Sequence, residues 1–157
     1  GLKHFVELSK DDSFQIVLIG ITDKQKDALP KNFITIRRTS NQKELAAYYT
    51  MADIYLNPTY LETLSMTNIE AQACGTPVVT FRSGGAPETV CNDTGFVVAQ
   101  GDVDALHESI IQIIKVGKRH YSKKCVNRAK EMFNKEDRYN DYFELYQSLL
   151  KKCNNEK

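Results

Sequence analysis

The stretch from Asp53 to Thr89 decides the fold and reads DIYLNPTYLETLSMTNIEAQACGTPVVTFRSGGAPET. It contains an apolar run that ends at Asn57, a polar loop, a segment with helical periodicity over 65–74, and a second apolar run over 78–81. Short apolar runs rich in β-branched residues are typical of strands buried on both faces. The Gly75-Thr76-Pro77 segment is a typical helix end. This order of strand, helix and strand predicts parallel strands joined by a crossover helix.

The same alternation continues on both sides of this stretch. The expected strands span 15–20, 33–37, 53–57, 78–81 and 95–99. The expected helices span 2–11, 23–29, 42–52, 65–74, 86–91, 103–116, 120–133 and 136–152. Strands that alternate with helices predict an α/β fold, Rossmann-like, with a parallel sheet of at least five strands and helices on both faces.

Length and composition predict one globular domain, because the chain has 157 residues with 41% hydrophobic and 26% charged residues. A formal net charge of +1 gives no global field that would gather nucleic acid, so no nucleic-acid partner is expected and phosphate recognition must be local. Helical periodicity begins with the first residues, which predicts that residues 1–157 are a single domain truncated from a longer protein.

The four cysteines lie far apart and lack metal-ligand spacing, which favours reduced thiols and a cytoplasmic protein. No run approaches the roughly 18 apolar residues that a membrane-spanning helix needs. Residues 118–130 hold six Lys or Arg and no acidic residue. Two interpretations of this run stay open: a solvated helix surface, or peripheral contact of the longer protein with anionic lipid.

A ligand site is expected just after the third strand. Ligands of doubly wound sheets bind beyond the carboxyl ends of the strands, and Glu62 falls in a loop at this edge. The amides near Ser65, Met66 and Thr67 open a helix and lack intrahelical acceptors, so they can bind an anion such as a diphosphate. Glu70 lies in the second turn, where a carboxylate can accept hydrogen bonds from a vicinal diol such as ribose.

Further candidates are less specific. Arg37 and Arg38 follow the second strand and can meet a base or phosphate, but solvated arginines are common there. Gly84 and Gly85 fit a tight turn and also close approach of a ligand to the backbone. The two glutamates can also be interpreted as ordinary solvated carboxylates, which are common in loops and on helix surfaces.

Five linked features resemble a known family. They are Glu62, Glu70 after seven intervening residues, the helix end at Ala73-Cys74, the Gly75-Thr76-Pro77-Val78-Val79 segment and the Gly84-Gly85-Ala86-Pro87-Glu88 turn. In this order they resemble the C-terminal, donor-binding domain of retaining GT-B glycosyltransferases of family 4 (glycosyl transferases group 1).

The resemblance implies a hexosyl-type transferase that binds a nucleotide-diphosphate sugar. Glu62 would contact the donor sugar and stabilise the transition state, Glu70 would hold the ribose, and amides near Met66 and Thr67 would bind the diphosphate. No metal would be needed. A saccharide or lipid-linked acceptor would bind a separate N-terminal domain, so the domain alone would be inactive, and polysaccharide biosynthesis is the expected role.

Two departures from the family pattern leave an alternative. The family commonly has Gly-aromatic-Gly after the first glutamate, whereas this chain has Thr63-Leu64-Ser65, and the family's arginine and lysine before the first helix lie outside this chain. A non-catalytic nucleotide- or phosphosugar-binding module is therefore the alternative to a transferase. A glycoside hydrolase pair fits poorly, because one glutamate is expected on a loop and the other inside the following helix.

Overall fold

The structure is a computed structural model that describes residues 1–155, with side chains described to Lys152. The helices are α1 (Leu2–Leu8), α2 (Asp23–Asp27), α3 (Gln42–Met51), α4 (Met66–Ala73), α5 (Ala86–Thr89), α6 (Val103–Val116), α7 (Lys118–Phe133) and α8 (Lys135–Asn155). The strands are β1 (Val17–Ile19), β2 (Ile34–Ile36), β3 (Tyr55–Asn57), β4 (Val78–Phe81) and β5 (Gly95–Val98). Every expected element is present, which confirms the predicted α/β order, although α1, α2 and α5 end two or three residues earlier than expected.

All strand pairs are parallel, as predicted, but the expected single sheet is divided into two. β1 pairs with β2, and β3, β4 and β5 form a separate three-stranded sheet in that order. Strands of three or four residues make few ladder hydrogen bonds, and side chains join the two sheets instead. Ile16, just before β1, packs with Leu56 of β3 against the same core cluster.

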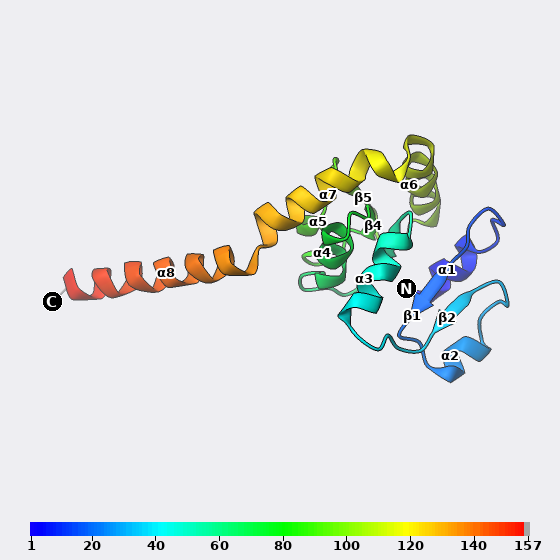
Figure 1. Cartoon of the computed structure of the whole chain (residues 1–157), viewed down its shortest axis with the longest axis horizontal. Coiled ribbons are helices and arrows are strands. Elements are labelled where there is room, and N and C mark those ends of the chain that lie inside the picture. The colour runs from blue at the N-terminus through cyan, green and yellow to red at the C-terminus, as the bar shows by residue number, and fades with distance from the viewer. Residues whose placement is uncertain (156–157) are drawn as a thin grey trace.

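Helices cover both faces of the larger sheet. Successive side chains of β4 point to opposite faces, and each set packs against different helices. Val79 and Phe81 pack with Leu106 of α6 in the larger core cluster, and both are fully buried. Val78 packs on the other side with Tyr49 of α3 and Ala71 of α4. Figure 1 shows α3, α4 and α5 gathered beside the strands, with α6 at the upper right of the body.

The last helix leaves this body. α8 extends away from the packed elements as a long single helix (Figure 1), and its apolar side chains, including Tyr142 and Phe143, are exposed. Over the described residues, none of the helices combines the length and the apolar character that crossing a bilayer requires.

Candidate functional site

The loop that carries Glu62 is anchored at both ends by Asn57, the last residue of β3. The side-chain amide of Asn57 donates to Ser65 Oγ at 2.8 Å and to Asn68 Oδ1 at 3.0 Å. Ser65 is the residue that precedes α4, and its buried hydroxyl makes no capping bond to the helix. The Ser65 hydroxyl instead lies 3.3 Å from the hydroxyl of Thr67. The first amides of α4 therefore begin the helix without a side-chain cap, as an anion site at a helix N-terminus requires.

The two predicted glutamates lie on either side of the start of α4 along the chain, Glu62 in the preceding loop and Glu70 within the helix. Burial raises the pKa of Tyr55, a hydrogen bond with Thr67 lowers it, and the charges of Glu70 and Glu62 make smaller contributions that raise it. Glu62 is half-buried in the loop, and its Oε1 accepts a hydrogen bond from the backbone N–H of Thr63 at 3.1 Å. The two carboxylates thus flank a helix start that has no side-chain cap.

Glu70 is exposed on α4 and is held by a neighbouring helix. The hydroxyl of Tyr49, on α3, donates a hydrogen bond to Glu70 Oε2 at 3.1 Å. Tyr49 itself is buried, and its ring meets that of Tyr55 edge-on with 5.4 Å between centroids. Burial raises the pKa of Tyr49, with smaller contributions from Tyr55 and Glu70, so its hydroxyl stays protonated and available as a donor.

The glycine turn after β4 packs directly on the glutamate loop. Gly84 has φ of +48°, and a Cβ atom at this position would overlap the carbonyl oxygen of Glu62. The N–H of Gly85 donates to the carbonyl of Thr63 at 3.0 Å, and a Cβ there would overlap the same carbonyl. Both glycines are therefore required by backbone packing, which supports the turn interpretation and places Gly84 beside Glu62.

Buried polar side chains connect α4 to α5. Asn68 donates to Thr89 Oγ1 at 3.0 Å, and Gln72 donates to the Thr89 carbonyl at 2.7 Å. Arg128 of α7 donates to the carbonyls of Thr89 and Glu88, at 3.2 and 2.8 Å. These bonds hold the short helix that follows the glycine turn.

Arg37 lies apart from this cluster. It is exposed at the end of β2 and forms a 3.7 Å ion pair with Asp23. In the part of the chain that the structure describes, no hydrogen bond or ion pair connects Arg37 to Glu62 or Glu70. β2 belongs to the two-stranded sheet, which explains this separation.

Several residues that shape the site were missed from the sequence. The sequence pattern predicts a strand that ends at Asn57 and helices that contain Asn68, Gln72 and Tyr49, but it assigns none of these side chains to the site. The signal was the presence of amide side chains within apolar patterns, since a buried amide needs hydrogen-bond partners. Another missed contact is that of His4, a buried residue of α1, with the hydroxyl of Tyr60 at 2.9 Å.

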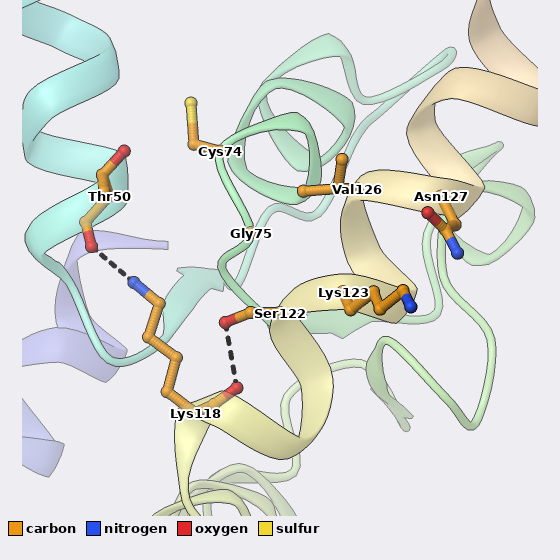
Figure 2. A pocket seen from close by; sticks show the side chains of 8 residues that line it. All are labelled: Thr50, Cys74, Gly75, Lys118, Ser122, Lys123, Val126 and Asn127. Carbon is orange, nitrogen blue, oxygen red and sulfur yellow. Dashed lines mark hydrogen bonds between the residues drawn. The ribbon is translucent and has the colours of Figure 1, made fainter.

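An open pocket of about 530 Å³ lies at the other edge of the sheet, where Gly75 precedes β4 (Figure 2). It contains none of the predicted site residues. One of its two lysines, Lys118, donates to the carbonyls of Thr50 and Ala52 at the end of α3, and burial lowers the pKa of this lysine. Lys118 therefore serves as a cap for α3. Among the side chains that the structure describes, no group of three or more His, Cys, Asp or Glu is arranged to hold a metal ion.

The architecture is that of GT-B glycosyltransferases. The structure matches sucrose-phosphate synthase from Thermosynechococcus elongatus with a TM-score of 0.81 and 26% identity, over 96% of this chain and 42% of the synthase. It also matches HepE of Anabaena, solved in complex with UDP, with a TM-score of 0.78 and 19% identity, over 94% of this chain and 45% of HepE.

Sequence comparison gives the family. The family model described as "Glycosyl transferases group 1" matches residues 2–132, and the chain belongs to this family. A GDP-mannose-dependent alpha-(1-6)-phosphatidylinositol monomannoside mannosyltransferase of Mycolicibacterium smegmatis is 45% identical over 76 residues, which are 43% of this chain and 20% of the relative. The chain thus spans less than half the length of these proteins.

Proposed function

We propose that the protein containing this chain transfers a sugar from a nucleotide-diphosphate donor to an acceptor hydroxyl, with retention of configuration at the sugar. The observation that carries the proposal is the uncapped start of α4, which follows the loop of Glu62 and precedes Glu70, whose carboxylate is held by Tyr49. Membership of the family supports it. So do the relatives, since one is named as GDP-mannose-dependent and another was solved with UDP.

In this proposal each part of the donor meets a different group. Glu70 accepts hydrogen bonds from the ribose hydroxyls through the carboxylate that Tyr49 orients. The diphosphate lies at the amides near Met66 and Thr67, with the hydroxyl of Ser65 behind them, where the helix dipole favours negative charge. Glu62 faces the sugar from the loop that the glycine turn supports.

Catalysis then depends on positioning and on charge. As the bond from the sugar to the diphosphate breaks, negative charge grows on the leaving phosphate and positive charge on the sugar. Preorganised amides stabilise the former and the carboxylate of Glu62 the latter. We propose that helix amides and cationic side chains stabilise the leaving group without a metal ion. A saccharide or lipid-linked acceptor would bind a second domain of a cytoplasmic protein that contacts the membrane peripherally.

A second candidate is a nucleotide- or phosphosugar-binding module without turnover. The hydrogen bond from the N–H of Thr63 to Glu62 favours it, because the carboxylate is bound by its own loop rather than directed away from it. The presence of Thr63-Leu64-Ser65 in place of Gly-aromatic-Gly points the same way.

The experiment combines binding with turnover. UDP, GDP and ADP are titrated calorimetrically into the native protein that contains this chain, and release of the nucleoside diphosphate from UDP-glucose and GDP-mannose is then measured with candidate acceptors. Acceptor-dependent release supports the transferase. Binding without release in any combination supports the module, and the absence of nucleotide binding would contradict both.

A further inference from the structure

The carboxylate of Glu70 is exposed on a helix surface, yet it is attached to a buried side chain of another helix. The hydroxyl of Tyr49 donates to its Oε2 at 3.1 Å, while Oε1 has no hydrogen bond with the described residues. A glutamate on a helix surface ordinarily samples several rotamers, and one bond to a fixed donor removes much of that freedom. One carboxylate oxygen is therefore held and the other remains available to a ligand.

Tyr49 is itself fixed on three sides, so it can serve as a rigid donor. Tyr49 is 9% exposed and packs with Ala71 and Val78, and the edge-on contact of its ring with that of Tyr55 sets the ring plane. The backbone carbonyl of Tyr49 accepts a hydrogen bond from Thr76 Oγ1 in the turn that follows α4. The end of α3 is thereby bound to the helix that carries Glu70.

We propose that Tyr49 is a positioning residue that orients Glu70 toward the ribose of the donor, and that this contact gives the site its preference for ribonucleotides over deoxyribonucleotides. The inference rests on the proposed role of Glu70. A carboxylate held in one orientation accepts hydrogen bonds from two neighbouring hydroxyls at a lower entropic cost than a mobile one. A deoxyribose offers only one of these hydroxyls, so the orientation of Glu70 matters less for its binding.

The test compares two ligands on each variant. Dissociation constants for UDP, GDP and ADP and for their 2′-deoxy counterparts are measured by calorimetry on the native protein, and the nucleotide that binds most tightly is used further. Tyr49→Phe keeps the ring and removes only the donor. It is expected to weaken binding of the ribonucleotide about 3- to 10-fold and to leave the deoxyribonucleotide nearly unchanged.

Three controls make the result specific. Tyr48→Phe changes a neighbouring tyrosine of α3 whose hydroxyl makes no hydrogen bond with the described residues, and it should change neither ligand's affinity. Glu70→Ala should abolish the ribose preference. In the Glu70→Ala background, Tyr49→Phe should have no further effect, because the two side chains act as one unit. Melting temperatures identify any variant that fails to fold.

The outcomes separate this inference from the proposed function. If Glu70→Ala leaves the ribose preference intact, Glu70 does not bind ribose, and both the role and the inference are wrong. If Glu70→Ala abolishes the preference but Tyr49→Phe does not lower it, only the inference is overturned. A gain in affinity for Tyr49→Phe would also overturn it, because Tyr49 would then compete with the ribose for Glu70.

Discussion

Gly84 lies so close to Glu62 that a Cβ atom at position 84 would overlap the Glu62 carbonyl oxygen. The two residues come from loops that follow adjacent parallel strands, β3 and β4. Gly84 also has φ of +48°, a conformation that residues with a Cβ rarely adopt. The backbone of the proposed catalytic loop is thus set by its contact with the glycine turn.

Gly84→Ala is therefore expected to destabilise the protein by roughly 2–4 kcal/mol, because it adds a strained φ to a backbone overlap. Gly20→Ala is the matched control. Gly20 also has a positive φ, at 87°, but its Cβ would meet open space, so only the conformational cost of roughly 1–2 kcal/mol remains. Denaturant unfolding measures both, and equal losses in the two variants would show that the contact with Glu62 contributes nothing.

The sequence predicted the elements well because their signals are local. Runs such as 78–81 and the helix end at Gly75 depend on residues next to one another in the chain. The division into two sheets was not predictable in this way, since it depends on which strands meet in space. The same holds for Arg37: its place after a strand suggested the ligand edge, yet it pairs with Asp23 at the end of the smaller sheet.

The two glutamates of the site could be predicted from the sequence, but the hydrogen bonds that hold the site could not. Glu62 and Glu70 could be identified from their spacing and from the sequence around them. The hydrogen bond from Tyr49 to Glu70 joins residues 21 apart, and that from Arg128 to Glu88 joins residues 40 apart. No periodicity in the sequence indicates such a pair, because each partner fits an ordinary helical pattern.

Arg128→Leu is expected to destabilise the protein by about 1–2 kcal/mol, because it removes the donors to the carbonyls of Glu88 and Thr89 at the end of α5. Arg119→Leu, on the exposed face of the same helix, is the matched control and should lie within about 0.5 kcal/mol of the parent. Chemical denaturation measures the difference. A loss for Arg119→Leu as large as that for Arg128→Leu would attribute the effect to helix α7 in general.

Asp11 gives the stability a defined dependence on pH. Hydrogen bonds from the hydroxyl of Ser13, from His107 and from the N–H of Ser13 lower its pKa to about 2. A carboxyl whose pKa is lowered in the folded state stabilises that state above its ordinary pKa, and the contribution is lost as the pH falls toward 2. The melting temperature of Asp11→Asn should therefore lie below that of the parent above about pH 5 and converge with it near pH 2.

The control for this pH dependence is Asp12→Asn. Asp12 is the exposed neighbour of Asp11 and makes no hydrogen bond with the described residues. Its variant should follow the parent at every pH. A constant difference between Asp11→Asn and the parent from pH 7 to pH 2 would mean that titration of Asp11 is not the cause.

Glu70→Ala in the native enzyme should mainly weaken donor binding. The proposed contact with ribose exists in the ground state and in the transition state alike, so its loss raises KM and leaves kcat nearly unchanged. Loss of a charged hydrogen bond costs roughly 1.5–3 kcal/mol, or about a 10- to 150-fold rise in KM. Steady-state kinetics and calorimetric titration of the nucleoside diphosphate measure the two effects, and a fall in kcat with unchanged affinity would contradict the assignment.

Glu62→Ala should have the opposite kinetic effect, lowering kcat more than it weakens donor binding. Its proposed interaction strengthens as positive charge develops on the sugar, so kcat should fall by a larger factor than donor affinity. Binding of the free nucleoside diphosphate, which lacks the sugar, should barely change.

Glu62→Gln keeps the size of the side chain and its hydrogen bond from the Thr63 N–H, so it separates loss of charge from loss of loop structure. If Glu62→Ala abolishes nucleotide binding while Glu70→Ala preserves it, the two roles are reversed. If neither variant changes turnover or binding, the donor does not bind between these glutamates.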